Sequence, residues 1–322
     1  MKTILAALLL LNFNLLAEEI SSCQEISSPG QYVVTKPLSS SGNCLVIKSD
    51  DVQIDCQDNL ISSDNSKNNN GIFAEGQKNL SITGCNIRGF ENGIQIKNSD
   101  KIQISNNFIM KSGVYGLLIH YYTKNALIEK NTINSAGHVC MILSGGNGND
   151  YSLPPANHIV RHNNLESCKD SGIHLYDSIG GVNAFDNQIL NSGRGVSSDR
   201  GSKNKFVKTR ISGAREGIAF VLSAQDNIFE DFSIDNTQTG ILFEHWGQNN
   251  GNIFRNGHIS SQGLQVKIDN SVNSAIRFYD TPINQISICP NEITVCYNEQ
   301  CEQRKCLEAQ KELPLPNNNN RY

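Results

Sequence analysis

Apolar residues recur along the middle of the chain at a fixed spacing. A small residue followed by an apolar, usually branched residue returns every 22 to 24 residues, with one longer interval of 32. The pairs are Gly71-Ile72, Gly93-Ile94, Gly116-Leu117, Cys140-Met141, Gly172-Ile173, Gly195-Val196, Gly217-Ile218, Gly240-Ile241 and Gly263-Leu264. The long interval coincides with Ser144–Asn157, a Gly-, Asn- and Pro-rich stretch, which predicts a loop inserted into a regular array.

Two further apolar columns keep step with the first over eight units. One consists of Ile87, Ile109, Ile133, Leu165, Ile189, Ile211, Ile234 and Ile259, and the other stands five residues earlier and ends in Phe206, Phe229 and Phe254. Asn columns accompany them, namely Asn107, Asn131, Asn163 and Asn187, and then Asn204, Asn227 and Asn252. Agreement between independent columns makes a chance repeat very improbable.

Within each unit the apolar residues alternate with polar ones, as in Ile94/Ile96 and Ile173/Leu175, and this period of two indicates short β-strands. Three short strands per unit make one coil, and coils of equal length stack at roughly 4.8 Å. We therefore predict an all-β, single-stranded, right-handed parallel β-helix of about 9–10 coils. A leucine-rich repeat is excluded because its Leu-x-x-Leu-x-Leu spacing is absent.

The stacked coils account for the unusual abundance of Asn. An Asn side chain at a turn can pass amide hydrogen bonds from one coil to the next, and it tolerates left-handed backbone. We interpret the Asn columns as structural ladders, not as ligands or catalysts.

The two ends of the chain depart from the repeat. Residues 1–17 combine Lys2, an apolar run and Ala17, which predicts a cleaved signal peptide and a secreted or periplasmic protein. Residues 18–50 and 281–313 are expected to cap the β-helix of residues 51–280, with a short helix over Asn298–Leu313. Residues 314–322 are expected to form a disordered tail.

Composition and charge narrow the function classes. The formal net charge of -4 argues against binding of nucleic acid, and no segment after residue 17 is long and apolar enough to span a membrane. In an exported protein the ten cysteines favour disulfides. The candidates are Cys23, Cys44, Cys56, Cys85, Cys289, Cys296, Cys301 and Cys306, while pairing of Cys140 and Cys168 stays open. Zinc binding by the last four is the alternative, although their spacing matches no CxxC pair.

These repeats resemble those of the pectate-lyase-like superfamily of right-handed parallel β-helix proteins. The segment from Cys23 to Cys56, with SPGQYVVTKPL and Cys44-Leu-Val-Ile, is most similar to NosD-type exported β-helix proteins. The resemblance implies the fold over about residues 23–280 but no single activity, since the superfamily includes lyases, hydrolases, epimerases, phage tailspikes and non-enzymatic surface proteins. The catalytic motifs of its mannuronan epimerases, polygalacturonases and lyases are absent from this sequence.

One face of the predicted β-helix gathers the residues that could carry chemistry. The outward positions after each Gly, together with the next residue along, place eight polar side chains on neighbouring coils. They are Lys97, His120, Tyr121, His174, Tyr176, Asp177, Asp199 and Arg200, and the Ser144–Asn157 loop emerges among them. We predict His120, Tyr176, Asp177, Asp199 and Arg200 as catalytic, and Lys97, Tyr121 and His174 as substrate-binding residues.

These residue types fit the binding and processing of a polysaccharide. We expect the protein to be a monomer. A lyase or epimerase would use His120 or Tyr176 as base and Arg200 or Lys97 to bind a uronate carboxylate, whereas a hydrolase would use Asp177 and Asp199. No cofactor is required, with calcium bound by the two carboxylates as an open alternative. The competing hypothesis is a non-enzymatic envelope or surface scaffold whose polar face is merely solvated.

Overall fold

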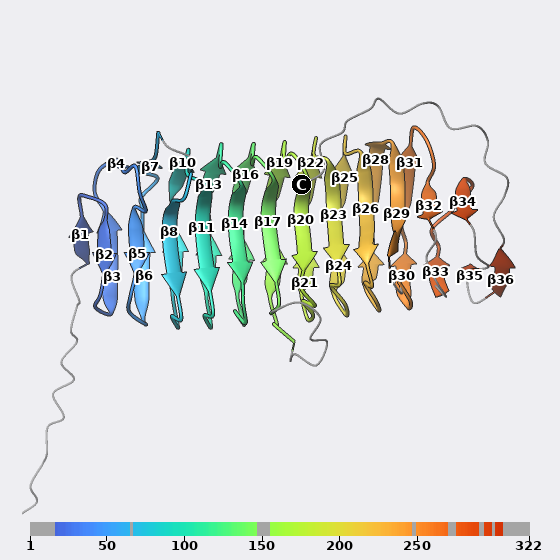
Figure 1. Cartoon of the computed structure of the whole chain (residues 1–322), viewed down its shortest axis with the longest axis horizontal. Helices are drawn as coiled ribbons and strands as arrows, with labels where there is room; N and C mark the ends of the chain where they lie inside the picture. The colour runs from blue at the N-terminus through green and yellow to red at the C-terminus, as the bar shows by residue number, and fades with distance from the viewer. Residues whose placement is uncertain are drawn as a thin grey trace, which may run out of the picture.

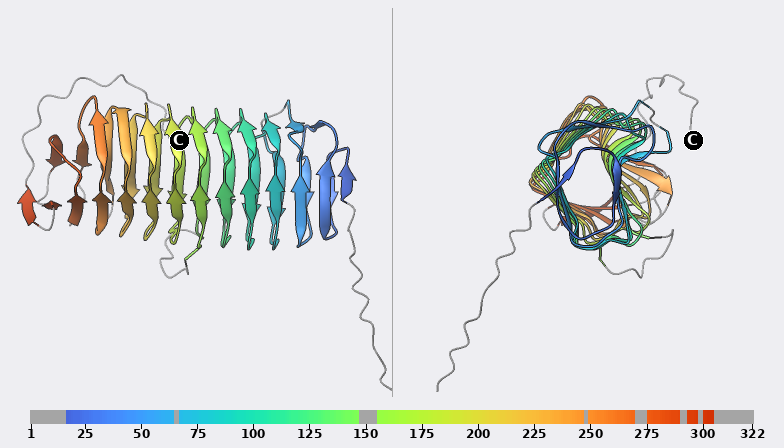
Figure 2. Two further views of the ribbon diagram at one scale, coloured as in Figure 1. Left: turned by 180° about the vertical axis from the view of Figure 1, so that it is seen from behind. Right: turned by 90° about the vertical axis from the view of Figure 1, so that its left-hand side faces the viewer.

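Short parallel strands pair from coil to coil in the computed structural model, which describes residues 17–64, 67–146, 155–246, 249–269, 275–289, 293–297 and 300–304. The strands form three sheets of 14, 10 and 12 members that run along the length of the molecule (Figure 1). Successive coils superimpose when the molecule is viewed along its long axis (Figure 2). The chain is therefore an all-β parallel solenoid, as the repeat predicted, and it has about 11 turns where the repeat predicted about 9–10.

The strands are assigned to the three sheets as follows. The 14-stranded sheet contains β1 (Glu18–Ile20), β3 (Gly30–Val34), β6 (Val52–Asp55), β9 (Ser81–Thr83), β12 (Gln103–Ser105), β15 (Leu127–Glu129), β18 (Ile159–Arg161), β21 (Asn183–Phe185), β24 (Lys205–Val207), β27 (Ile228–Glu230), β30 (Asn252–Arg255), β33 (Ala275–Tyr279), β35 (Ile293–Tyr297) and β36 (Gln300–Arg304). The 10-stranded sheet contains β4 (Leu38–Ser39), β7 (Leu60–Ser62), β10 (Asn86–Arg88), β13 (Phe108–Met110), β16 (Thr132–Asn134), β19 (Asn164–Glu166), β22 (Gln188–Leu190), β25 (Arg210–Ser212), β28 (Ser233–Thr237) and β31 (His258–Ser261). The 12-stranded sheet contains β2 (Gln24–Ile26), β5 (Leu45–Ile47), β8 (Asn70–Glu75), β11 (Asn92–Lys97), β14 (Tyr115–His120), β17 (Val139–Ser144), β20 (Ser171–Tyr176), β23 (Arg194–Asp199), β26 (Glu216–Leu222), β29 (Thr239–Trp246), β32 (Val266–Asp269) and β34 (Ile286–Cys289).

The register confirms the apolar columns as stacks. Ile94 pairs with Ile72 and Leu117, and the column continues in register to Ile241. These side chains are buried and form one continuous core. Toward the C-terminus the core becomes aromatic, with Phe206, Phe229, Phe254 and Phe278 stacked at centroid distances of 4.8, 5.5 and 5.2 Å.

The Asn columns are hydrogen-bonded ladders. The Oδ1 of Asn131 accepts from the backbone N–H and the side-chain Nδ2 of Asn107, both at 3.0 Å, and its own Nδ2 donates to Asn163. The column of Asn204, Asn227 and Asn252 repeats this arrangement. Buried amides are satisfied from coil to coil, so these residues are structural, as predicted.

Two expectations about the C-terminal part are wrong. Ile241 pairs with Val266, so Gly263-Leu264 lies two residues out of register with the other repeat pairs. The predicted helix over Asn298–Leu313 is replaced at Gln300–Arg304 by β36, which pairs antiparallel with β35, and no described residue is helical. Helix propensity is a weak preference, and the hydrogen bonds offered by an open sheet edge outweigh it. Residues 305–322 and the predicted signal peptide through residue 16 lie outside the described residues.

Disulfides link neighbouring coils. Cys23 pairs with Cys44 and Cys56 with Cys85 near the N-terminus, and Cys140 pairs with Cys168 across the coil that carries the insertion. Cys301 is also disulfide-bonded. These bonds are compatible with an oxidising compartment outside the cytoplasm. No helix among the described residues has the length and apolar character needed to cross a membrane.

Candidate functional site

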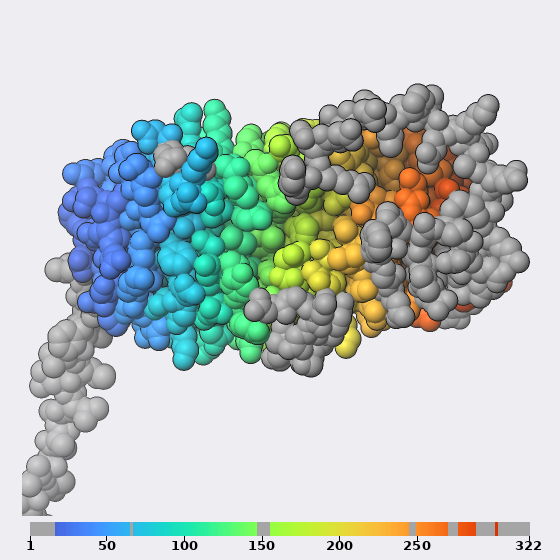
Figure 3. Space-filling model, viewed as in Figure 1, coloured from blue at the N-terminus to red at the C-terminus, as the bar shows by residue number. Residues whose placement is uncertain are grey.

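The outer face of the 12-stranded sheet runs the length of the molecule on the side shown in Figure 3. The predicted site residues lie along this face, at or just after the C-terminal ends of β11, β14, β20 and β23, apart from His174, which lies within β20. Parallel pairing sets Lys97 beside His120 and Ser144 beside Tyr176. The coil of β17 separates two clusters of predicted residues, so they form two neighbouring groups.

The first group is held together by Arg200. Its Nη2 donates a hydrogen bond to Oδ1 of Asp177 at 3.3 Å. Its Nε lies 3.3 Å from Oδ1 of Asp199, close enough for an ion pair but without the geometry of a hydrogen bond. The guanidinium also stands 5.7 Å from the centre of the Tyr176 ring. Because one planar cation contacts both acids, the two carboxyl groups lie within about 9 Å of each other.

Burial raises the pKa of both carboxyl groups, but the neighbouring charges and hydrogen bonds differ between them. Burial raises the pKa of Asp199, against the lowering effect of Arg200, and the charges of Asp177 and Glu244 raise it further. Burial also raises the pKa of Asp177, but Arg200 and a hydrogen bond from Ser144 act in the opposite direction. The pKa of both carboxyl groups is thus raised, with acidic neighbours acting alongside burial at Asp199 and Ser144 acting against it at Asp177.

The second group surrounds His120. Its Nε2 lies 3.1 Å from Nε2 of Gln95, and its ring lies 4.2 Å from that of Tyr121. Burial lowers the pKa of His120 to about 4, with the charge of Lys97 acting in the same direction. The imidazole is therefore neutral at neutral pH and weakly basic. Lys97 itself lies over the ring of Phe73 at 5.5 Å.

His174 lies in the outer face but its polar atoms are covered. It stands in register between Ile142 and Ser197, and both ring nitrogens are buried without a hydrogen-bond partner among the described residues. Burial lowers its pKa to about 4. The ring meets that of Tyr176 edge-on at 5.6 Å. His174 therefore supports Tyr176 from beside it and offers no exposed nitrogen to a substrate.

The sequence interpretation missed a third set of charges on this face. Arg194 forms ion pairs with Glu216 at 3.1 Å and with Glu244 at 2.7 Å, and it lies 4.0 Å from Asp170. Arg194 stands just before the Gly of the repeat, a position that had not been counted as outward. In the outward column that begins with Phe73 and Gln95, Ser197 and Ala219 are buried even though they face away from the core, whereas Phe73, Gln95 and His174 are partly exposed.

An outer apolar cluster explains part of that burial. Leu118, Val139 and Ile142 pack together outside the sheet, with Tyr115 and Tyr176 against them. The alternation of the strand gives the direction of a side chain but not whether its neighbours cover it. The site is consequently a thin second layer on the sheet, with Asp177, Asp199 and Arg200 at its partly exposed edge.

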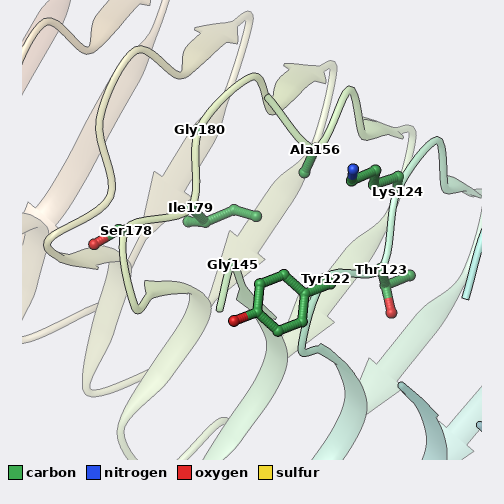
Figure 4. Close-up of a pocket in the computed structure, with 8 residues that line it drawn as sticks. All are labelled: Tyr122, Thr123, Lys124, Gly145, Ala156, Ser178, Ile179 and Gly180. Carbon is green, nitrogen blue, oxygen red and sulfur yellow. The ribbon is translucent and has the colours of Figure 1, made fainter. Parts of the chain in front are cut away.

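A small pocket lies beside the two groups at the corner that follows the 12-stranded sheet. It is lined by Tyr122, Thr123, Lys124, Gly145, Ala156, Ser178, Ile179 and Gly180 (Figure 4). Gly145 and Ala156 lie near the two ends of the Ser144–Asn157 insertion, while Ser178 directly follows Asp177. The insertion thus leaves the coil next to the predicted residues, as the sequence suggested, although residues 147–154 lie outside the described part.

The described residues contain no cluster of side chains that could bind a metal ion. Across the described ranges no three His, Cys, Asp or Glu side chains converge in a manner suited to a metal ion. The spacing of four residues makes His158 and His162 candidates for a metal-ligand pair, but His158 is buried and His162 exposed, so they do not share a site.

Comparison with known proteins identifies the family. The family described as "Right handed beta helix region" matches residues 38–207, which is just over half of the chain. The chain belongs to this right-handed β-helix family. No curated protein matches the sequence significantly. The more specific likeness to NosD-type proteins stays a prediction.

Solved β-helix structures share the fold at low identity. The mannuronan C-5 epimerase AlgE6 A-module from Azotobacter vinelandii has a TM-score of 0.60 and 12% identity, covering 84% of this chain and 90% of that chain. The AlgE4 A-module of the same organism has a TM-score of 0.58 and 14% identity, covering 87% and 91%. DFA-IIIase from Arthrobacter chlorophenolicus A6, in complex with GF2, has a TM-score of 0.55 and 15% identity, covering 76% and 69%. At these identities the similarity establishes the fold alone.

Proposed function

We propose that this β-helix protein binds a glycan along the outer face of its 12-stranded sheet and hydrolyses a glycosidic bond with Asp177 and Asp199. The observation that carries the proposal is the pair of carboxyl groups with raised pKa values that Arg200 holds together. Glycosidases place their two carboxyl groups roughly 5–9.5 Å apart. The contacts with Arg200 limit the separation of Asp177 and Asp199 to at most about 9 Å, below the upper end of that range.

The two acids would take different roles. Asp199, whose pKa is raised by burial and by its acidic neighbours, protonates the oxygen of the leaving sugar. Asp177, which Ser144 and Arg200 help to keep ionised, acts as base or nucleophile on the opposite side of the bond. Arg200 keeps both carboxyl groups in place and stabilises the charge that remains when the proton has moved.

A lyase or epimerase reaction is less well supported by the same groups. Such a reaction needs a base near neutral pH, but the pKa of His120 is lowered to about 4 and that of Tyr176 is raised by burial. It also needs a cation for the uronate carboxylate, and Arg200 already contacts two carboxylates of the protein. Hydrolysis is therefore preferred to proton abstraction.

Glycan chemistry and export are consistent with the other observations. The structures that share this fold include mannuronan C-5 epimerases and DFA-IIIase in complex with GF2, which supports a carbohydrate ligand by analogy of fold. The signal-like residues 1–17 and the three disulfides support a secreted or periplasmic location.

The test is incubation with a panel of acidic and neutral polysaccharides while new reducing ends are measured. Wild-type protein should release them, and Asp177→Asn or Asp199→Asn should lower the rate at least about a hundredfold. Asp186→Asn is the matched control, because Asp186 is an exposed turn residue away from this face. The rate should fall as pH rises through the raised pKa of Asp199, since the acid must be protonated. Unsaturated products would assign the site to a lyase instead.

A non-enzymatic scaffold is the second candidate. It is favoured by the ion pairs of Arg200, because they give both Asp177 and Asp199 a cationic partner without any ligand. In that case no glycan on the panel would be turned over. Asp199→Asn would instead lower thermal stability, since it leaves a partly buried guanidinium with one fewer partner.

A further inference from the structure

Two exposed aromatic side chains stand beside the candidate site. The side chains of Tyr121 and Tyr122 are 37% and 48% exposed, and among the described residues only Phe108 and Ile159 are comparable large apolar side chains at the surface. A single exposed aromatic residue needs no explanation, but two adjacent ones at a corner next to a pocket form a surface that a ligand can use.

The backbone at these two residues is unusual for aromatic side chains. Their φ angles are +48° and +55°, in the left-handed region that bulky residues rarely adopt. Two coils later the same corner is made by Asp177 and Ser178, with φ angles of +50° and +58°. Small polar residues therefore build this turn without aromatic rings, so the turn itself does not require tyrosine.

The pocket extends this aromatic surface toward Asp177. The ring of Tyr122 lies over the corner at Gly145 and faces the turn of Ser178 and Ile179 (Figure 4). Lys124 lines the same pocket and brings an ammonium group that can donate hydrogen bonds to a sugar hydroxyl or carboxylate. Aromatic faces with a few convergent polar groups are typical of small-molecule sites.

We propose that Tyr121 and Tyr122, with the pocket behind them, form a sugar-binding platform for the same glycan that Asp177 and Asp199 act on. This inference rests on the proposed function. Two coils separate the platform from Asp177, which corresponds to about 10 Å along the solenoid axis. That span is about the length of two sugar residues. A glycan that lies along the axis with one sugar on the platform therefore presents a bond about two residues farther along to the carboxyl pair, and at least three sugars are needed to reach both places.

The platform predicts a dependence on chain length. A substrate long enough to reach both places gains contacts with the tyrosine rings, whereas a disaccharide cannot occupy both at once. Tyr121→Asn and Tyr122→Asn remove the rings while supplying a residue that tolerates left-handed backbone, so these variants are expected to fold. Phe108→Ser is the control, since Phe108 is equally exposed but belongs to the 10-stranded sheet.

The experiment compares kcat/KM for a long oligosaccharide and a disaccharide of the same glycan. In Tyr122→Asn the ratio of long to short should fall on the order of tenfold, with Phe108→Ser at the wild-type ratio. An unchanged ratio in both tyrosine variants overturns the platform while the hydrolase assignment stands. If no glycan is cleaved, calorimetric binding of the long oligosaccharide decides: weaker binding by Tyr122→Asn supports the platform and refutes only hydrolysis, and no binding by wild-type protein refutes both.

Discussion

A buried histidine makes the stability of this solenoid dependent on pH. His158 is fully buried directly before β18, in the column that Asn204 and Asn227 occupy in later coils. Its Nδ1 accepts a hydrogen bond from the backbone N–H of Ala126 at 3.2 Å, as Asn204 does from Val182. An imidazole thus replaces one Asn of the ladder, and it must be neutral to accept this bond.

The magnitude follows from the shift of its pKa. Burial lowers the pKa of His158 from 6.5 to about 4. Between pH 6.5 and about pH 4, this histidine is therefore protonated in the unfolded chain but neutral in the folded chain. The free energy of unfolding therefore falls as pH falls through this window, by roughly 3 kcal/mol in total. Above about pH 6.5 the residue is neutral in both states and contributes no pH dependence.

Urea denaturation at several pH values, followed by circular dichroism, measures this effect. His158→Asn keeps an acceptor for Ala126 but has no proton to bind, so it should lose roughly 3 kcal/mol less than wild-type protein between about pH 6.5 and about pH 4. The cavity left by the smaller side chain costs the same at each pH and cancels. His162→Asn, at an exposed position, is the control. Equal acid sensitivity in wild type and His158→Asn would refute the reasoning.

Three other substitutions test the stacking of coils. Replacing Cys140 and Cys168 together by Ser should lower the free energy of urea unfolding by about 3–4 kcal/mol, because the disulfide closes a 28-residue separation; unchanged stability would mean that the bond does not form. Asn131→Ala breaks its ladder hydrogen bonds and should cost about 2–4 kcal/mol in the same assay, and a loss below about 0.5 kcal/mol would contradict the ladder. Gly116→Ala places a Cβ 2.6 Å from a carbonyl oxygen of the next coil, so its melting temperature should fall. Gly42→Ala, whose Cβ would lie 3.9 Å from the nearest atom, Oγ of Ser40, should melt like wild type.

Much of the fold was predictable because its information is local and repeated. Ile94, Leu117 and Ile173 each carry the same weak strand preference, and the shared spacing converts many weak preferences into one register. The prediction was wrong where the repeat weakens. The slip at Gly263 and the strand at Gln300–Arg304 both depend on which sheet edge is available, which a local pattern does not contain.

The sequence predicted which residues share the face of the candidate site, but not which of them contact one another. The repeat places Tyr176, Asp177 and Asp199 on one face, because residues one coil apart occupy equivalent positions. It does not indicate that Arg200 contacts both acids, since a long side chain can point in several directions from a turn. The repeat also does not predict the contact between Arg194 and Glu244, because these residues are 50 apart in the sequence and occupy non-equivalent positions in their coils.

The sequence by itself determined the solenoid, its inner ladders and the face on which polar residues gather, because a repeat of about 23 residues constrains each coil in the same way. Only the tertiary structure decided which of those polar residues touch, which are covered and how their pKa values move. Those properties depend on side-chain directions and on the second layer formed by Tyr115, Leu118 and Ile142 outside the sheet. Burial and charge contacts arise between coils, and they exist only once the coils are stacked.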